Sequence, residues 1–199
     1  MKVRPIIFSG WGVRAILEGR KTQTRRVIRR QPHPTWTRNY ELRPYDEDVL
    51  CGSILSPGYL SHCPYGVPGD RLWVRETFAL HPTETELGKP IVFYCSRGDT
   101  VLPNNKWRPT IYMPRWASRI TLEIVKVWVE RLWEISLRDI IAEGVLRGHR
   151  SDMALADAYT LLWDQLNARR GFGWLVNPWV WVIEFKVLDL KRTDIPRNP

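Results

Sequence analysis

Lys21 and Thr24 are the residues of this chain whose types and spacing best suit acid–base chemistry. They lie three positions apart in a strongly basic stretch, residues 20–26, with the sequence RKTQTRR. Neighbouring arginine charges lower the pKa of a lysine, which makes Lys21 a candidate general base toward the Thr24 hydroxyl. The alternative is a basic loop that binds phosphate without chemistry. The local sequence by itself favours that alternative.

Several common site types have no motif in the sequence. It contains no GxGxxG, GxxxxGK[ST], HExxH or GxSxG pattern. The four histidines are scattered through separate loops or turns, which disfavours a Ser-His-Asp hydrolase. Cys51, His62 and Cys63 match no zinc-finger spacing, so we expect neither a metal site nor a cofactor.

The elements around Lys21 decide whether it can meet Thr24. Residues 3–8 are expected to form a strand, and Ser9 is a plausible N-cap for a helix over 10–18. Gly19 is a natural helix stop. On a straight strand the side chains at 21 and 24 would face opposite ways. They can therefore converge only if the chain turns after Gly19.

A second strand is predicted over residues 71–78. Its alternation places Glu76 on the same face as Leu72, Val74 and Phe78. A charged group on an apolar face needs a partner or serves a site. Pairing with an arginine and a role in a site are equally favoured for Glu76.

The remaining signals predict two more long strands and two helices. Residues 119–130 form a strand whose apolar parity changes after Ile124, which indicates a bulge or a bend. Residues 179–188 form the closing strand, and helices are expected over 136–143 and 152–169, the latter with Leu166 facing inward. Residues 79–90 look irregular, before a short strand over 91–94.

This order of elements favours an α+β class over a repeating βα unit. We expect a mixed β-barrel of about five or six strands with flanking helices. One domain over residues 1–190 is expected, with long loop insertions near 29–68 and 79–118 and a polar tail at 191–199.

Charge and aromatic content point to a polyanionic partner. The net charge is +9, and 23 of the 30 basic residues are arginine, which grips phosphate and stacks on bases. Eleven tryptophans are present, and a few of them are candidates to stack a base. The alternative is a solvated basic surface, which is the less favoured interpretation.

The cysteines and the hydropathy pattern predict a cytoplasmic protein. Three cysteines without a CxxC pair are typical of a reducing compartment. The apolar run near the N-terminus is too short for a signal peptide, and no stretch approaches the ~20 apolar residues of a membrane span.

Three stretches of the sequence resemble the motifs of ASCH domains, which share a PUA-like fold. They are residues 19–26 (GRKTQTRR), 141–145 (IAEGV) and 181–185 (WVIEF), in the order of that family. Residues 69–77, 113–119 and 177–181 resemble a longer, prophage-associated branch. The resemblance implies a PUA-like barrel for most of the chain.

The resemblance also implies a function. Compact relatives are bacterial N(4)-acetylcytidine amidohydrolases that use a lysine, a threonine and a glutamate. By motif position these fall on Lys21, Thr24 and Glu143. Other ASCH proteins are regarded as RNA binders or ribonucleases, so a non-catalytic module for RNA or modified nucleic acid is the alternative. Either way, RNA or a modified nucleoside is the expected partner.

A wider set of residues is expected to bind substrate in the same cleft. Arginines would hold a phosphate or an acyl oxygen and form a basic rim. One tryptophan would stack on the base. The expected residues are Arg25, Arg26, Glu76, Arg115, Trp116, Arg119 and Trp174.

Overall fold

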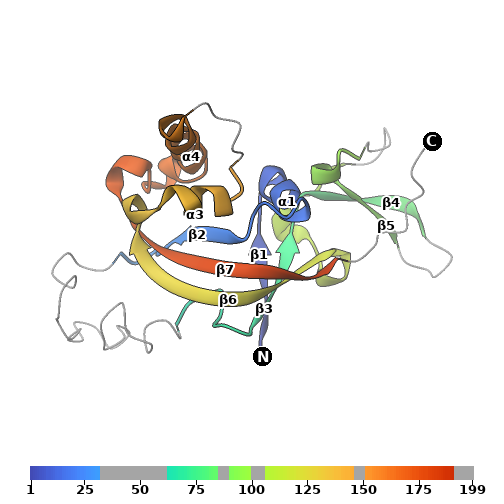
Figure 1. Cartoon of the computed structure of the whole chain (residues 1–199). Helices are drawn as coiled ribbons and strands as arrows, with labels where there is room; N and C mark the ends of the chain where they lie inside the picture. The colour runs from blue at the N-terminus through green and yellow to red at the C-terminus, as the bar shows by residue number, and fades with distance from the viewer. Residues whose placement is uncertain (32–61, 85–89, 100–105, 146–150, 191–199) are drawn as a thin grey trace.

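The computed structural model describes residues 1–31, 62–84, 90–99, 106–145 and 151–190. Within these ranges the chain forms one large sheet, a smaller hairpin and helices on the sheet (Figure 1). The strands are β1 (Val3–Ile7), β2 (Gln23–Val27), β3 (Arg71–Arg75), β4 (Phe78–Glu84), β5 (Pro90–Tyr94), β6 (Ile120–Arg131) and β7 (Trp179–Leu190). The α-helices are α1 (Gly10–Leu17), α3 (Leu137–Ala142) and α4 (Asp152–Asn167).

The large sheet is mixed and has the strand order β1-β3-β6-β7-β2. β1 pairs with β3 in parallel, and all other neighbours in this sheet are antiparallel. The α+β class and a main sheet of five strands are therefore confirmed. β1 and β2 are the two edges, so within the described residues the hydrogen-bonded ladder does not close into a complete barrel.

The long strands β6 and β7 run the length of the sheet and curve (Figure 1). Their register shifts between Thr121 and Leu122 and again between Ile124 and Lys126. The second shift confirms the bulge predicted from the change of parity after Ile124. A bulge bends its strand and raises the local twist, which brings the far ends of a curved sheet toward each other.

Local capping signals fix the helices, and all three predicted helices are confirmed to within a few residues. The Ser9 hydroxyl accepts a hydrogen bond from the Gly12 N–H at the start of α1. Ser136 and Asp139 form a reciprocal capping box at the start of α3. Ser151 accepts from the Ala154 N–H at the start of α4. Each cap satisfies a backbone donor that has no partner within the helix.

The first half of β7 is buried on both faces and separates two cores. Trp179, Trp181, Ile183 and Phe185 face the interior of the curved sheet, where Val13 of α1 also packs. The alternate residues Val180 and Val182 pack against a second cluster that includes residues of α3 and α4. α3 and α4 thus cover the outside of the sheet at β7 and β2, and the predicted inward face of β7 is only half of its buried surface.

The strand predicted over 71–78 ends at Arg75, and a separate strand β4 begins at Phe78. β4 and β5 form an antiparallel hairpin with a register shift between Leu80 and Glu84. The expectation of an irregular stretch over 79–90 was therefore wrong for its first half. A proline at position 82 lowered the strand signal, but an edge hairpin tolerates a residue that cannot donate.

Most of the predicted insertion near 29–68 and the tail at 191–199 lie outside the described residues, as does Cys51. In the described part of the chain, no helix is long and apolar enough to cross a membrane.

Candidate functional site

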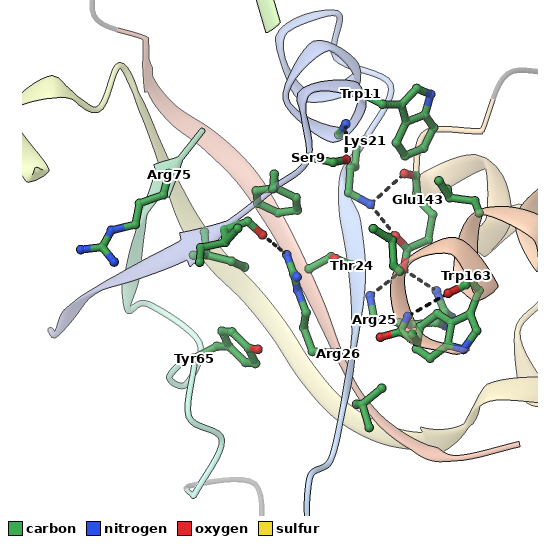
Figure 2. A pocket seen from close by; sticks show the side chains of 18 of the residues that line it. Ser9, Trp11, Lys21, Thr24, Arg25, Arg26, Tyr65, Arg75, Glu143 and Trp163 are labelled. Atoms are coloured by element: carbon green, nitrogen blue, oxygen red, sulfur yellow. Dashed lines mark hydrogen bonds and ion pairs between the residues drawn. The ribbon is translucent and has the colours of Figure 1, made fainter. Parts of the chain in front are cut away.

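A pocket of about 460 Å³ opens between the two edge strands, where a closed barrel would pair β1 with β2. We call this gap between the edges the seam. Residues 5–8 line one side of the pocket, Thr24 to Val27 line the other, and α4 contributes residues from its second half (Figure 2). The volume falls within the ~300–1,000 Å³ that is usual for small-molecule sites.

The C-terminal end of α1 positions Lys21. Gly19 has a φ of +71°, a left-handed conformation that reverses the chain. The carbonyl of Ala15 then accepts hydrogen bonds from the N–H groups of Arg20 and Lys21, at 2.9 and 3.0 Å. This is the turn that the sequence required, and it places the Lys21 side chain in the pocket just before β2 begins.

The C-terminal end of α3 positions Glu143, which caps that helix. Gly144 follows with a φ of +99°, and a Cβ atom there would lie 2.9 Å from the Ala15 Cβ and 3.1 Å from the Lys21 Cβ. Only glycine allows this close approach of α3 to the turn after α1. The Thr22 N–H also donates to the Ala142 carbonyl at 2.8 Å, which joins the two segments directly.

Lys21 and Glu143 form an ion pair whose side chains are only 4% and 8% exposed. The Lys21 Nζ donates to Glu143 Oε2 and also to the Glu143 carbonyl, the latter at 2.8 Å. The other carboxylate oxygen, Oε1, accepts from the Arg25 N–H at 2.6 Å. Both oxygens of Glu143 are therefore held, so the carboxylate has a fixed orientation toward Lys21.

The environment of Lys21 is suited to proton transfer. Burial lowers the pKa of Lys21 below its ordinary value, and the charges of Arg26 and Arg25 act in the same direction. The carboxylate of Glu143 opposes this, yet the net shift of the pKa is downward. A lysine poised in this way can take up and release a proton more readily than an exposed lysine.

The alternation of β2 sends its side chains to two sides. Gln23 and Arg25 share one side, where the Arg25 guanidinium contacts Glu130 and is fully buried. Thr24 and Arg26 share the other side, and both line the pocket. Within the described residues the Thr24 hydroxyl makes no hydrogen bond. Thr24 thus offers a free hydroxyl in the same pocket as the Lys21–Glu143 pair.

Arg26 spans the seam. Its Nη2 donates to the Ile7 carbonyl of the opposite edge strand at 2.5 Å (Figure 2). Its guanidinium lies 5.0 Å from the ring centre of Phe8, and its buried Nε has no hydrogen-bond partner among the described residues. Arg26 therefore has a donor available to a ligand, whereas the guanidinium of Arg25 already pairs with carboxylates.

Glu76 and Arg119 lie outside this pocket, contrary to the expectation that they bind substrate in it. They form a buried pair with each other, with Arg119 Nε 2.9 Å from Glu76 Oε1. The Ser96 hydroxyl also donates to Glu76. Of the two interpretations left open for Glu76, pairing with an arginine is the one that the structure shows. The charge of Glu76 on an apolar face is neutralised there by Arg119.

Arg25 and Arg26 line the pocket as expected, but Arg115, Trp116 and Trp174 lie away from it. Arg115 and Trp116 are exposed in the segment before β6. Trp174 packs edge-on against Tyr159, with ring centres 6.1 Å apart, and does not line the pocket. Arg29, Arg75 and Arg170 line the pocket beside Arg25 and Arg26, in place of the expected Arg115 and Arg119.

Three aromatic residues that line the pocket, Trp11, Tyr65 and Trp163, were not predicted from the sequence. A signal for Trp163 existed. Leu155, Tyr159, Trp163 and Asn167 follow each other at intervals of four, and all four are buried. Leu166 was expected on the inward face of this helix, but its side chain is 55% exposed.

Across the described ranges, no group of three or more His, Cys, Asp or Glu side chains is arranged to hold a metal ion. Cys63 is buried in the core, where burial raises the pKa of its thiol.

Comparisons with known proteins give a likeness of structure only. No protein-family model matches the sequence, and no curated protein does. The chain is similar to the solved ASCH domain from Lactobacillus crispatus JV V101, with 15% identity, a TM-score of 0.40, and coverage of 94% of this chain and 79% of that chain. It is also similar to a protein of the DUF984 family model from Enterococcus faecalis V583, with 10% identity, a TM-score of 0.44, and coverage of 99% and 86%. The first of these carries the family name that the sequence motifs resemble. What this chain does must follow from its own residues.

Proposed function

We propose that this chain hydrolyses the amide of an acylated nucleobase, such as N(4)-acetylcytosine, carried on a nucleotide or RNA. Lys21, Thr24 and Glu143 are the proposed catalytic residues. One observation carries the proposal: a buried Lys21–Glu143 ion pair shares a pocket with a threonine hydroxyl that has no partner in the described structure.

The proposed reaction has two steps. The Thr24 hydroxyl oxygen attacks the acyl carbonyl carbon, and its proton passes to the neutral amine of Lys21. The carbon–nitrogen bond then breaks, and Lys21 gives the proton to the departing exocyclic nitrogen of the base. In the second step water attacks the acyl-Thr24 ester, a proton passes through Lys21 to the Thr24 oxygen, and a carboxylic acid leaves.

Glu143 supports both steps as a positioning residue. For Lys21 to start as a neutral amine, the proton of the pair must rest on the carboxylate. The hydrogen bond from Lys21 Nζ to Glu143 Oε2 provides a direct path for that proton. The Arg25 N–H holds the carboxylate in place while the proton moves.

The charges of the pocket favour an anionic substrate. Its lining contains six cationic residues and one acidic residue, Glu143. The cationic residues are Lys21, Arg25, Arg26, Arg29, Arg75 and Arg170. Arginines bind phosphate through parallel N–H donors. A nucleotide or an RNA nucleotide is therefore a better fit than a neutral nucleoside.

Aromatic residues suit the base itself. Trp11, Tyr65 and Trp163 line the pocket together with Phe8. Recognition of unstacked bases commonly combines an aromatic face with hydrogen bonds to the base edge. The same features fit a non-catalytic module that binds RNA, so the test must separate turnover from binding.

The experiment compares wild type with Thr24→Ala and Thr24→Ser. Release of the acid from N(4)-acetylcytidine 5′-monophosphate is followed, and binding of cytidine monophosphate is measured separately. We expect Thr24→Ala to lose several orders of magnitude in turnover, while affinity changes by only about 1 kcal/mol, the net value of one hydrogen bond. Thr24→Ser retains a hydroxyl and should retain part of the turnover.

Thr22→Ala is the matched control, because Thr22 is exposed and does not line the pocket. Equal turnover by wild type and Thr24→Ala would remove Thr24 from the mechanism. Binding of the nucleotide without any turnover by wild type would favour the RNA-binding module over the enzyme.

A further inference from the structure

Residues 106–117 expose an unusual number of large apolar side chains in one short segment. Trp107 is 37% exposed, Ile111 55%, Tyr112 68% and Trp116 49%. We call this segment the platform. Exposed aromatic clusters on a folded domain mark contact sites more often than chance. The platform is distinct from the pocket, because none of its residues lines the pocket.

Buried residues of the platform pack against the β4–β5 hairpin and fix its backbone. Met113 and Ala117 are fully or nearly fully buried, in a small core with Phe78 and Tyr94 of the hairpin. The Tyr94 hydroxyl donates to the Ala117 carbonyl at 2.9 Å. Two 3-10 turns, Thr110–Tyr112 and Arg115–Ala117, carry three of the exposed apolar side chains. The aromatic residues are therefore presented by an ordered backbone, which lowers the entropy cost of binding.

The charge of the platform points to a polyanion. Lys106, Arg108 and Arg115 are exposed, and residues 106–117 include no Asp or Glu. Alternating cationic and aromatic side chains are the combination that single-stranded nucleic acid needs, because the bases stack and the phosphates are neutralised. A purely apolar partner would leave these cations unpaired.

A short connection joins the platform to the pocket. Arg75 lines the pocket at the end of β3, and the next residue is Glu76. Glu76 pairs with Arg119, which is three residues after Trp116, and its N–H donates to the Met113 sulfur at 3.3 Å. In Figure 1 the β4–β5 hairpin extends away from the sheet on the side where α1 lies. A single-stranded nucleic acid that leaves the pocket past Arg75 would therefore approach the platform.

We propose that the platform binds single-stranded RNA that flanks the nucleotide held in the pocket. The inference deepens the proposed function, since it makes a polymer the substrate. Trp107, Tyr112 and Trp116 stack on bases, and Arg108 and Arg115 bind phosphates. Binding at the platform does not itself require that the pocket be catalytic.

The first test measures affinity for a labelled oligouridylate of about 12 nucleotides, within the usual span of single-strand sites. We expect Tyr112→Ala with Trp116→Ala to weaken binding by about 30-fold or more, from about 1–3 kcal/mol for each of two stacked bases. Trp133→Ala is the control, because Trp133 is 53% exposed but lies outside the platform. Equal affinity of the double variant and the control would overturn the proposal.

The second test uses charge. Arg108→Gln with Arg115→Gln should reduce the slope of log affinity against log salt by roughly 1.4, from about 0.7 for each phosphate on a single strand. Both side chains are exposed, so the variant should fold like wild type. An unchanged slope would remove these arginines from the RNA contact.

Turnover separates this proposal from the proposed function. Platform variants should hydrolyse an acetylated mononucleotide at the wild-type rate and should be slower only on an acetylated oligonucleotide. If wild type hydrolyses nothing but binds the oligouridylate through the platform, the platform stands and the enzyme fails. Self-association of wild type that the aromatic variant abolishes, with RNA affinity unchanged, would identify a second copy of the chain as the occupant and overturn the proposal.

Discussion

Replacing Glu143 by Gln keeps the size of the side chain, removes its charge and turns one of its two acceptor oxygens into an NH2 donor. In wild type the carboxylate pairs with Lys21 and accepts from the Arg25 N–H. The amide oxygen of Gln can still accept that N–H, but the Lys21 ammonium loses its counterion. The change therefore removes both the charge and the hydrogen-bond acceptor that face Lys21.

The expected cost follows from burial. Lys21 and Glu143 are 4% and 8% exposed, and breaking a buried pair by removing one partner costs about 3–5 kcal/mol. Without the Glu143 carboxylate the pKa of Lys21 falls further below its ordinary 10.5, because burial lowers this pKa and the carboxylate that raises it is gone. Deprotonation limits the loss, so we expect about 3 kcal/mol of unfolding free energy at neutral pH.

The stability of Glu143→Gln should depend on pH through Lys21. In Glu143→Gln the unfolded chain binds a proton at Lys21 up to pH 10.5, whereas the folded chain releases it at a lower pH. The unfolded state therefore holds more protons between the two pKa values, and the stability of the variant rises with pH across that window. Below the folded pKa the full penalty remains.

Urea unfolding monitored by tryptophan fluorescence measures these effects. Lys21→Met in the Glu143→Gln background should recover part of the lost stability, since it removes the unpaired ammonium. Unfolding of Glu143→Gln at the same urea midpoint as wild type would contradict the coupling of Lys21 and Glu143. So would a double variant in which Lys21→Met lowers the free energy of unfolding as much as it does in wild type.

Three further predictions concern single positions. Gly144→Ala should destabilise the fold by about 1–3 kcal/mol in urea unfolding, because its φ is +99° and the new Cβ would lie 2.9 Å from that of Ala15; a smaller loss would contradict the strain. Burial raises the pKa of Tyr94 to about 12, so Tyr94 alone should lower wild-type stability by about 2 kcal/mol as pH rises from 10 to 12. Burial also raises the pKa of Tyr159, so Tyr94→Phe should still lose stability, but by about 2 kcal/mol less than wild type, when both proteins are unfolded in urea across this range. Glu76→Gln should leave Arg119 unpaired and speed amide hydrogen exchange in the β4–β5 hairpin, whereas unchanged exchange would show that the pair does not hold it.

Much of the position of Lys21 was predictable, because its determinants are local. Ser9 caps α1 and Gly19 ends it, and both signals are visible within ten residues of sequence. The capping box at Ser136 likewise defines α3, and Glu143 closes it. What brings these helix ends together is the close approach at Gly144, which the sequence marks only by a glycine.

The residues that were placed incorrectly depend on long-range contacts. Glu76 and Arg119 are 43 positions apart, and no local pattern says that they neutralise each other. On α4 two apolar series compete, and only the packing of the helix shows that the buried one contains Trp163 and not Leu166. The width of the seam depends on the angle through which the bulges of β6 and β7 bend the sheet. The change of apolar parity in the sequence indicates a bend but not its angle.

The seam has a consequence for self-association. An unpaired strand edge is a template on which another chain can add a strand, and proteins usually block such edges with charges or covers. Here the edge strands β1 and β2 border the same pocket, and the Arg26 guanidinium already donates a hydrogen bond to the Ile7 carbonyl. A change that widens the pocket would expose the unpaired backbone groups of both edge strands at once. The size of the binding site and the resistance of the protein to aggregation are therefore set by the same geometry.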